Sequence, residues 1–341
     1  MALSVNQRAL RLAKEMEART EELKIKVAEA PCGAKILDCG VGAPGSLEAG
    51  VYVARICTGD LAEISLGNMD YDGLSLPAIN VSTDYPAVET MGCQLADWEI
   101  NVGGYYALGS GPARALAPDR RLPRGVALRE AEYRARGLSI RRPREIYEEI
   151  NYWDSSDAAV IVLESSALPP NEALTHVAEK CGVKPANLYA VVTPTSSVAG
   201  STQIAARVVE VGVHKLGLLG LNFDSFVFGS GQAPIPPPHP KLEAAMGRVN
   251  DAIRFAGLTF YLVKGKGDGE LDSLTRKVPS CNTENYGKLF LEAFKEAGRK
   301  FYSIELTFFS PAVATLSSAE TGATFSSGKV NPVMLKRALG P

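Results

Sequence analysis

Hydrophobic and polar positions follow two rhythms along the chain, one typical of helices and one typical of strands. Apolar residues three or four positions apart predict helices at 4–22, 47–57, 87–96, 171–181, 202–216, 285–297 and 332–339. Short apolar runs predict strands at 35–39, 61–66, 76–82, 98–102, 158–164, 188–193, 223–228, 258–264 and 306–316. This succession predicts an α/β (α+β) chain but gives no strand order.

The length predicts two domains, since 341 residues exceed the roughly 100–200 of one typical domain. We expect mixed α/β domains at 1–145 and 146–341, with an approximate boundary that the chain can cross more than once. The two halves share a short sequence similarity, because GSGPA at 109–113 resembles GSGQAP at 229–234. This similarity suggests one similar loop in each half.

The segment 117–144 differs from its surroundings. Ten arginines lie between Arg114 and Arg144, and large apolar residues are sparse. This composition favours a solvated surface excursion that contributes little to the core. The alternative is a flap over an anionic ligand, or a contact between subunits.

Composition excludes several classes of protein. The formal net charge is -2, and no run approaches the ~18 apolar residues of a membrane span, so neither nucleic acid nor a membrane is an expected partner. The first residues lack the apolar core of a signal peptide. Six cysteines without a CxxC pair indicate free thiols in a reducing compartment, and three scattered histidines show no metal-ligand spacing. We therefore expect a cytoplasmic protein without a metal site.

The stretch 201–216 has an unusual polar stripe. At about 100° per residue, Gln203, Arg207, Glu210 and His214 fall within roughly 60° of one another on an otherwise apolar helix. Such a helix is expected to be buried with its stripe facing a partner or a cavity. Arg207 and Glu210, three positions apart, can pair with each other. The pair is either a packing salt bridge or a carboxylate tuned for acid–base chemistry.

Three further groups are candidates for ligand binding. Gly109, Ser110, Gly111 and Arg114 form either a plain strand-to-helix turn or an anion site at a helix N-terminus. Asp84 precedes a predicted helix, where capping is its default role. Glu164, Thr195 and Ser197 follow two consecutive predicted strands, where α/β proteins place ligands.

Long runs of the sequence resemble the methenyltetrahydromethanopterin cyclohydrolases. They include LDCGVGAPGSLEAG, LPAINVSTDYPAV, YYALGSGPARALA, LESSALP, TPTSSVAGSTQIAARVVEVG, GQAPIPP and AMGRVNDAI, which span nearly the whole chain in order. The segment 117–144 departs from this resemblance and looks like an insertion.

The resemblance implies a metal-free enzyme of one-carbon metabolism that hydrolyses 5,10-methenyltetrahydromethanopterin to the 5-formyl derivative. It implies a homotrimer whose subunits have two α/β domains with the pocket between them, and a pterin that is substrate rather than bound cofactor. Arg207 and Glu210 match the reacting pair, GSGPARA matches a phosphate-binding element, and Asp84, Glu164, Thr195, Ser197 and Gln203 are expected to contact the substrate. The alternatives are a non-catalytic pterin or phosphometabolite-binding protein and, less well supported, a phosphotransferase.

Overall fold

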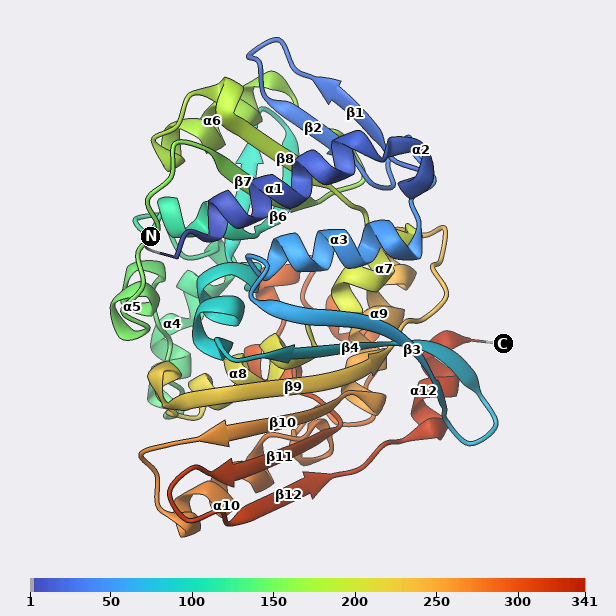
Figure 1. Ribbon diagram of the computed structural model, residues 1–341. Helices are drawn as coiled ribbons and strands as arrows, with labels where there is room; N and C mark the ends of the chain where they lie inside the picture. The colour runs from blue at the N-terminus through green and yellow to red at the C-terminus, as the bar shows by residue number, and fades with distance from the viewer. Residues whose placement is uncertain (1–2, 341) are drawn as a thin grey trace.

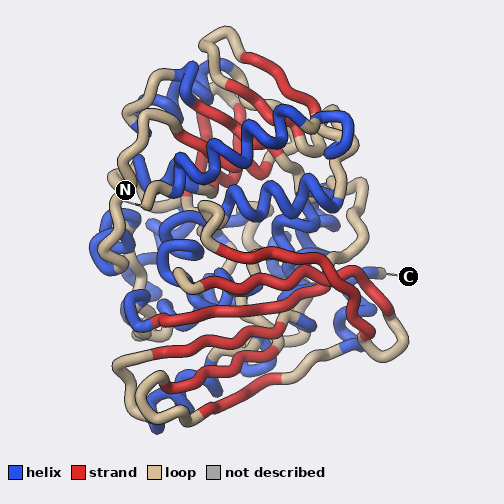
Figure 2. The backbone as a smooth tube through the Cα atoms, viewed as in Figure 1, coloured by secondary structure: helices blue, strands red, loops and turns tan. Residues whose placement is uncertain are grey.

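The computed structural model describes residues 3–340, which form two mixed β-sheets joined by a layer of helices (Figures 1 and 2). The α/β class predicted from the sequence is confirmed. The first sheet contains, in spatial order, β1 (Lys26–Glu29), β2 (Lys35–Asp38), β8 (Leu188–Val192), β7 (Ala159–Glu164), β6 (Tyr105–Ser110) and β5 (Trp98–Val102). The second contains β12 (Thr324–Gly328), β11 (Val313–Ser318), β10 (Leu258–Val263), β9 (Phe226–Pro234), β4 (Ser75–Thr83) and β3 (Ala62–Asp70).

Strands from both sides of residue 145 enter each sheet. β1, β2, β5 and β6 of the first sheet precede that position, whereas β7 and β8 follow it. In the second sheet β3 and β4 precede it and the other four strands follow. The chain therefore crosses between the sheets several times, and a single cut at 145/146 does not separate them.

The first sheet is covered on both faces. β7 is apolar up to Glu164, its last residue, and its apolar side chains alternate between two cores, as expected of a central strand. Ile161 faces α6 (Asn171–Cys181), whereas Val160 faces α1 (Val5–Ala18) and α3 (Leu47–Cys57). The predicted helix 4–22 is interrupted at Arg19, after which α2 (Thr20–Leu23) adds one short turn.

The second sheet packs one face against helices, and within residues 3–340 no helix covers its other face (Figure 1). The covering layer includes α8 (Val208–Leu218), α9 (Leu242–Ala256) and α10 (Asp268–Lys277). A Cβ atom at Gly229 of β9 would lie 3.2 Å from Val209 Cγ1 of α8, and one at Gly231 would lie 2.9 Å from Val208 Cγ1. The two glycines thus let the helix lie close to the strand.

The remaining helices lie around these layers. They are α4 (Arg124–Ala135), α5 (Pro143–Glu149), α7 (Val198–Ala205), α11 (Phe290–Glu296) and α12 (Pro332–Leu339), together with short 3₁₀ turns η2 (Pro112–Leu116), η3 (Pro185–Asn187), η4 (Phe223–Ser225), η5 (Ser280–Asn282), η6 (Phe301–Ser303) and η7 (Leu306–Phe308). The predicted helix 87–96 is a π-helix, η1 (Val88–Gln94), a rare form that often occurs at functional sites. The predicted strand 306–316 was wrong in its first half, which forms η7 before β11 begins.

Candidate active site

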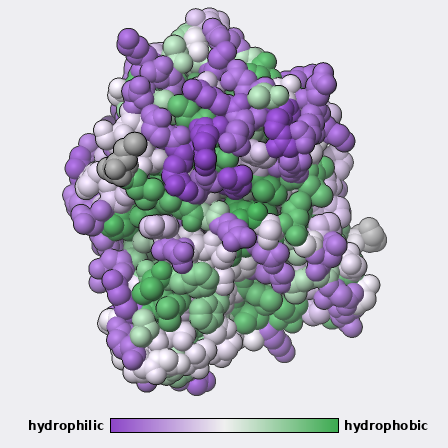
Figure 3. Space-filling view, viewed as in Figure 1, coloured by the Kyte–Doolittle hydropathy of each residue, from purple (hydrophilic) through white to green (hydrophobic). Residues whose placement is uncertain are grey.

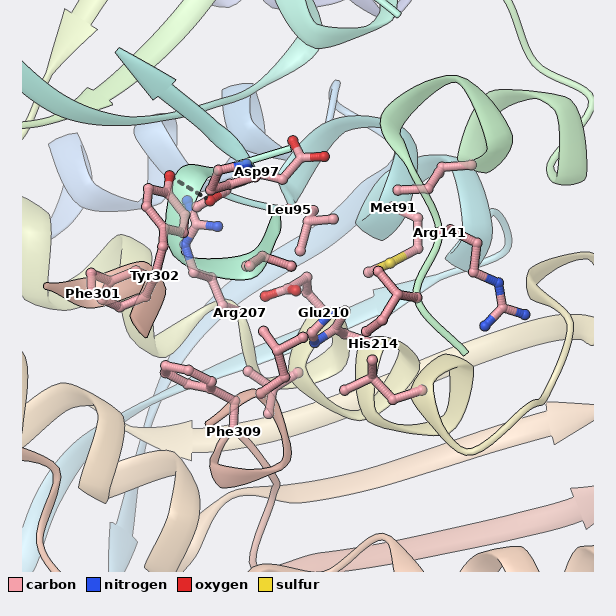
Figure 4. A pocket seen from close by; sticks show the side chains of 18 of the residues that line it. Met91, Leu95, Asp97, Arg141, Arg207, Glu210, His214, Phe301, Tyr302 and Phe309 are labelled. Atoms are coloured by element: carbon pink, nitrogen blue, oxygen red, sulfur yellow. Dashed lines mark hydrogen bonds between the residues drawn. The ribbon is translucent and has the colours of Figure 1, made fainter. Parts of the chain in front are cut away.

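A largely apolar pocket opens where the helical layer meets the end of the first sheet. Its cavity volume is about 150 Å³, and the cavity continues into open space at the protein surface. Its wall includes Glu164 at the end of β7, Arg207, and Glu210 and His214 of α8. Phe301, Tyr302 and Phe309 line one side of the pocket, and Figure 4 shows the Glu210 carboxylate in its middle.

The helix that carries the polar stripe is broken at Arg207. The sequence predicted one continuous helix at 202–216, but α7 ends at Ala205 and α8 begins at Val208. Arg207 itself has φ -80° and ψ 6°, outside regular helical geometry. The break turns the Arg207 side chain toward the first sheet.

Arg207 is held by uncharged partners. Its guanidinium donates to the backbone oxygen of Gln94, to Ser110 Oγ at 3.0 Å and to Gln203 Oε1 at 3.3 Å. Only 8% of the residue is exposed. Because none of these partners is an acid, the positive charge of Arg207 remains unneutralised beside the pocket.

Glu210 has no hydrogen-bond or ion-pair partner among residues 3–340. The predicted ion pair with Arg207 does not form, since the guanidinium is directed to Gln94, Ser110 and Gln203 instead. Burial raises the pKa of the Glu210 carboxyl to about 7, and the Arg207 charge opposes that rise. A buried carboxylate with a pKa near neutrality and a free edge in a pocket is suited to general-base catalysis.

Glu164 is the second carboxyl that faces the pocket. Thr195 at the end of the next strand donates its hydroxyl hydrogen to Glu164 Oε1. Burial raises the pKa of Glu164, and the Thr195 hydrogen bond and the Arg207 charge oppose the rise. β7 and β8 are parallel neighbours, so Glu164 at the end of β7 and Thr195 shortly after β8 lie side by side.

The structure adds polar groups that the sequence did not single out as site residues. Asp97 lines the pocket between Arg114 and Arg120; burial alone would raise its pKa, but the two cations lower it to about 2. Glu89 on η1 is fully buried, and neither of its carboxyl oxygens has a hydrogen-bond partner. The partners of Asp97 lie 17 and 23 positions further along the chain, so local periodicity does not mark this residue.

The Gly109–Arg114 run does not form an open anion site. Gly109 and Ser110 pair with β7 inside the sheet, and the Gly111 amide already donates to Cys93 O at 2.9 Å. The Arg114 side chain is fully buried, with its Nε 2.5 Å from Asp97 Oδ1. A guanidinium that is fully buried and paired with Asp97 in this way is not available to a ligand anion.

Three more expected contact residues lie away from the pocket lining. Asp84 is exposed after β4, and Thr83 rather than Asp84 accepts from the Tyr85 amide. Ser197 caps α7 by accepting from the Gly200 amide at 2.9 Å. Gln203 is buried behind Arg207 and orients it. The side chain of Ser197 therefore serves to cap a helix, and that of Gln203 serves to support Arg207.

The segment 117–144 is an ordered wall of the pocket rather than a solvated excursion. It places Leu122, Pro123, Val126, Ser139, Ile140 and Arg141 in the lining. Tyr133 of α4 is fully buried and Val126 and Ile140 nearly so. Most arginines of the segment form ion pairs with acidic residues. Arg129 and Arg136 both pair with Glu305, and Arg141 pairs with Glu149 at 2.9 Å. Tertiary partners thus supply the order that the local composition does not indicate.

Two properties of the described chain bear on ligands. Residues 3–340 contain no group of three or more His, Cys, Asp or Glu side chains placed to hold a metal ion. Within the same residues, no helix is long and apolar enough to cross a membrane.

Comparison with known proteins identifies the family. A family model described as Cyclohydrolase (MCH) matches residues 4–135 and 134–339, and the two matches meet inside the segment 117–144. Proteins named methenyltetrahydromethanopterin cyclohydrolase are similar along their length. The one from Methanococcoides burtonii is 40% identical over 338 residues, that from Methanocaldococcus jannaschii 40% over 341, and one from Methanococcus maripaludis 41% over 342; each alignment covers 99% of this chain and 98% of the relative. The chain belongs to the methenyltetrahydromethanopterin cyclohydrolase family.

Proposed function

We propose that this protein hydrolyses 5,10-methenyltetrahydromethanopterin to 5-formyltetrahydromethanopterin, with Glu210 as the general base. The observation that carries the proposal is the Glu210 carboxylate, which has no hydrogen-bond or ion-pair partner in the described protein and stands in the middle of a largely apolar pocket. The names of the relatives supply the substrate.

The chemistry matches what the pocket offers. The bridging carbon of the substrate lies in an amidinium-like cation, so it is already electrophilic. A mostly apolar pocket with an ionised carboxylate attracts such a cation and excludes bulk water. Positioned general-base catalysis contributes typically about 10²–10⁴-fold. One correctly placed carboxylate therefore supplies a large part of the catalysis.

The proposed reaction runs through a tetrahedral intermediate. The oxygen of a water molecule bonds to the bridging carbon while Glu210 takes one of its protons. Glu210 then returns this proton to N10 as the carbon–N10 bond breaks. The remaining hydroxyl proton is released as the formyl C=O forms, so a cation and water become a neutral product and one proton.

Arg207 and Glu164 serve this step in different ways. The unneutralised charge of Arg207 keeps a sufficient fraction of Glu210 ionised near pH 7. Glu164, steadied by Thr195, offers a carboxylate to hydrogen-bond donors of the bound pterin. We do not assign substrate contacts to Asp84, Gly109, Ser110, Gly111, Arg114, Ser197 or Gln203, since none of them lines the pocket.

No metal or tightly bound cofactor takes part in the proposed reaction, because the pterin itself is the electrophilic substrate. We place the reaction in the cytoplasm, since the six cysteines are free thiols, as expected in a reducing compartment.

We further propose that the protein works as a homotrimer. The uncovered face of the second sheet offers a contact surface, because its outward side chains are mainly uncharged. They include Phe228, Leu258, Phe260, Leu262 and Val313, which are all partly exposed. Figure 3 shows apolar and neutral colours over this sheet, in contrast to the hydrophilic surface over α1. Sedimentation of the purified protein at trimer mass would support the proposal, and a monomer would contradict it.

An absorbance assay tests the proposed activity. Loss of the methenyl chromophore on adding enzyme, faster than the spontaneous hydrolysis, is the expected result. Binding of the methenyl pterin without turnover would instead identify a non-catalytic pterin-binding protein. Turnover of a phosphorylated metabolite, with no effect on the pterin, would contradict the proposal altogether.

A further inference from the structure

His214 is a polar side chain in the pocket that the proposed reaction has not yet used. It lies on α8 one turn after Glu210, and both residues line the pocket. Neither the imidazole nor the Glu210 carboxylate has a hydrogen-bond partner among residues 3–340, and both face the pocket. Two polar groups left unpaired at a pocket surface are placed to bind something that enters the pocket.

The spacing of the two residues fits one water molecule. Residues four apart on a helix have Cβ atoms about 5–6 Å apart and project from the same face. Side chains that project side by side from one helix face can share a water that donates to both, at about 2.7–3.2 Å from each acceptor. Figure 4 shows His214 next to Glu210 on the same side of the pocket.

The imidazole is in the state that can accept such a bond. Burial lowers the pKa of His214 to about 4, so the ring is neutral near pH 7 and one nitrogen is an acceptor. The charged groups around it are Asp97, which favours the imidazolium, and Lys215 and Arg141, which oppose it; Glu210 lies on its own helix. The cations therefore reinforce the effect of burial.

We propose that His214 is a catalytic residue that positions the attacking water together with Glu210. The inference rests on the proposed hydrolysis. One hydrogen of the water points to the Glu210 carboxylate, which takes that proton, and the other points to the acceptor nitrogen of His214. Both hydrogens are then occupied, and an oxygen lone pair is directed at the bridging carbon. No bond beyond those of the hydrolysis forms or breaks, and His214 takes no proton in this step.

Three variants test this role. His214→Leu removes the acceptor and keeps an apolar volume, so kcat should fall about 10- to 100-fold while KM stays within about twofold, as for other losses of reactant positioning. His214→Gln offers a side-chain carbonyl oxygen as a replacement acceptor and should recover part of kcat. His176→Leu is the matched control, since His176 lies on α6 outside the pocket lining and should leave both constants unchanged.

The melting temperature of each variant is measured on the same sample. A near-normal kcat for folded His214→Leu would overturn the proposal. Equal losses in His214→Leu and His214→Gln, or a loss confined to KM, would also overturn it, because a packing or binding role predicts those patterns. Failure of the proposed function itself would show separately, as absence of turnover by the unsubstituted enzyme.

Discussion

Replacing Arg207 with glutamine should move the acidic limb of the pH–rate profile to higher pH. Glu210 must be ionised to accept a proton, and the Arg207 charge is the main influence that lowers its pKa against burial. Without that charge the pKa of Glu210 rises. Activity is then lost at low pH and regained as the pH increases through the new value.

The size of the effect follows from the pKa of about 7. A unit charge at ~6 Å contributes about 2–3 kcal/mol at an effective dielectric constant of ~20, and relaxation of the site reduces the net change to about one pKa unit. At pH 7 the ionised fraction would fall from about one half to about one tenth, a fivefold loss of kcat/KM, with the titration loss almost reversed by about pH 9.

The assay is kcat/KM for the methenyl pterin from pH 5.5 to 9.5. Arg207→Lys is the matched control, because it keeps the charge while losing the fork that binds Gln94 and Ser110. Its acidic limb should stay near that of the unsubstituted enzyme even if its overall rate falls. An unchanged limb in Arg207→Gln would refute the coupling between Arg207 and Glu210.

Three further predictions concern the rest of the chain. Arg114→Ala should lower the free energy of unfolding by about 3–5 kcal/mol, because it breaks a buried ion pair with Asp97. The KM of the folded fraction should stay unchanged. Chemical denaturation and kinetics on one sample check both results, and a raised KM at normal stability would contradict them. Replacing residues 121–138 by a short linker should lower the melting temperature and reduce kcat/KM at least about tenfold. The reason is that α4 buries Tyr133 and lines the pocket. An active enzyme of normal stability would mean that the segment is dispensable. Exhaustive chelation should leave turnover unchanged, since no acidic or histidine cluster is needed to polarise a cationic substrate; a loss restored by zinc would contradict the metal-free mechanism.

Local pattern was sufficient where one segment determines its own structure. The bounds of α3 and α6 and of β5 agree with the prediction residue by residue. Local signals mark two of these ends: Ser46 caps the start of α3, and Gly182 at φ 67° ends α6. The stripe was expected to face a partner or a cavity, and Arg207, Glu210 and His214 line one pocket.

Long-range partners explain what the sequence pattern missed. The break at Arg207 depends on acceptors at Gln94 and Ser110, about a hundred positions away, and periodicity within 201–216 carries no trace of them. For the run from Gly109 to Arg114 the sequence left open a plain strand-to-helix turn and an anion site; the structure has a strand followed by a turn, and Asp97 and Arg120 enclose Arg114. The segment 117–144 was expected to be solvated because its few apolar residues are scattered, yet α4 gathers Val126 and Tyr133 against Tyr302.

The turnover of Glu210→Gln tests the central claim most directly. Glutamine keeps the size of the side chain and removes its basicity, so kcat should fall at least about 10²-fold. The variant should remain folded and even gain up to about 3 kcal/mol of stability at pH 8. The pKa of Glu210 in the folded protein, about 7, lies above its value in the unfolded chain. Between these two pKa values, a rise in pH therefore destabilises the folded protein that carries Glu210, and the glutamine variant is free of this cost. A folded Glu210→Gln enzyme with near-normal kcat would contradict the account.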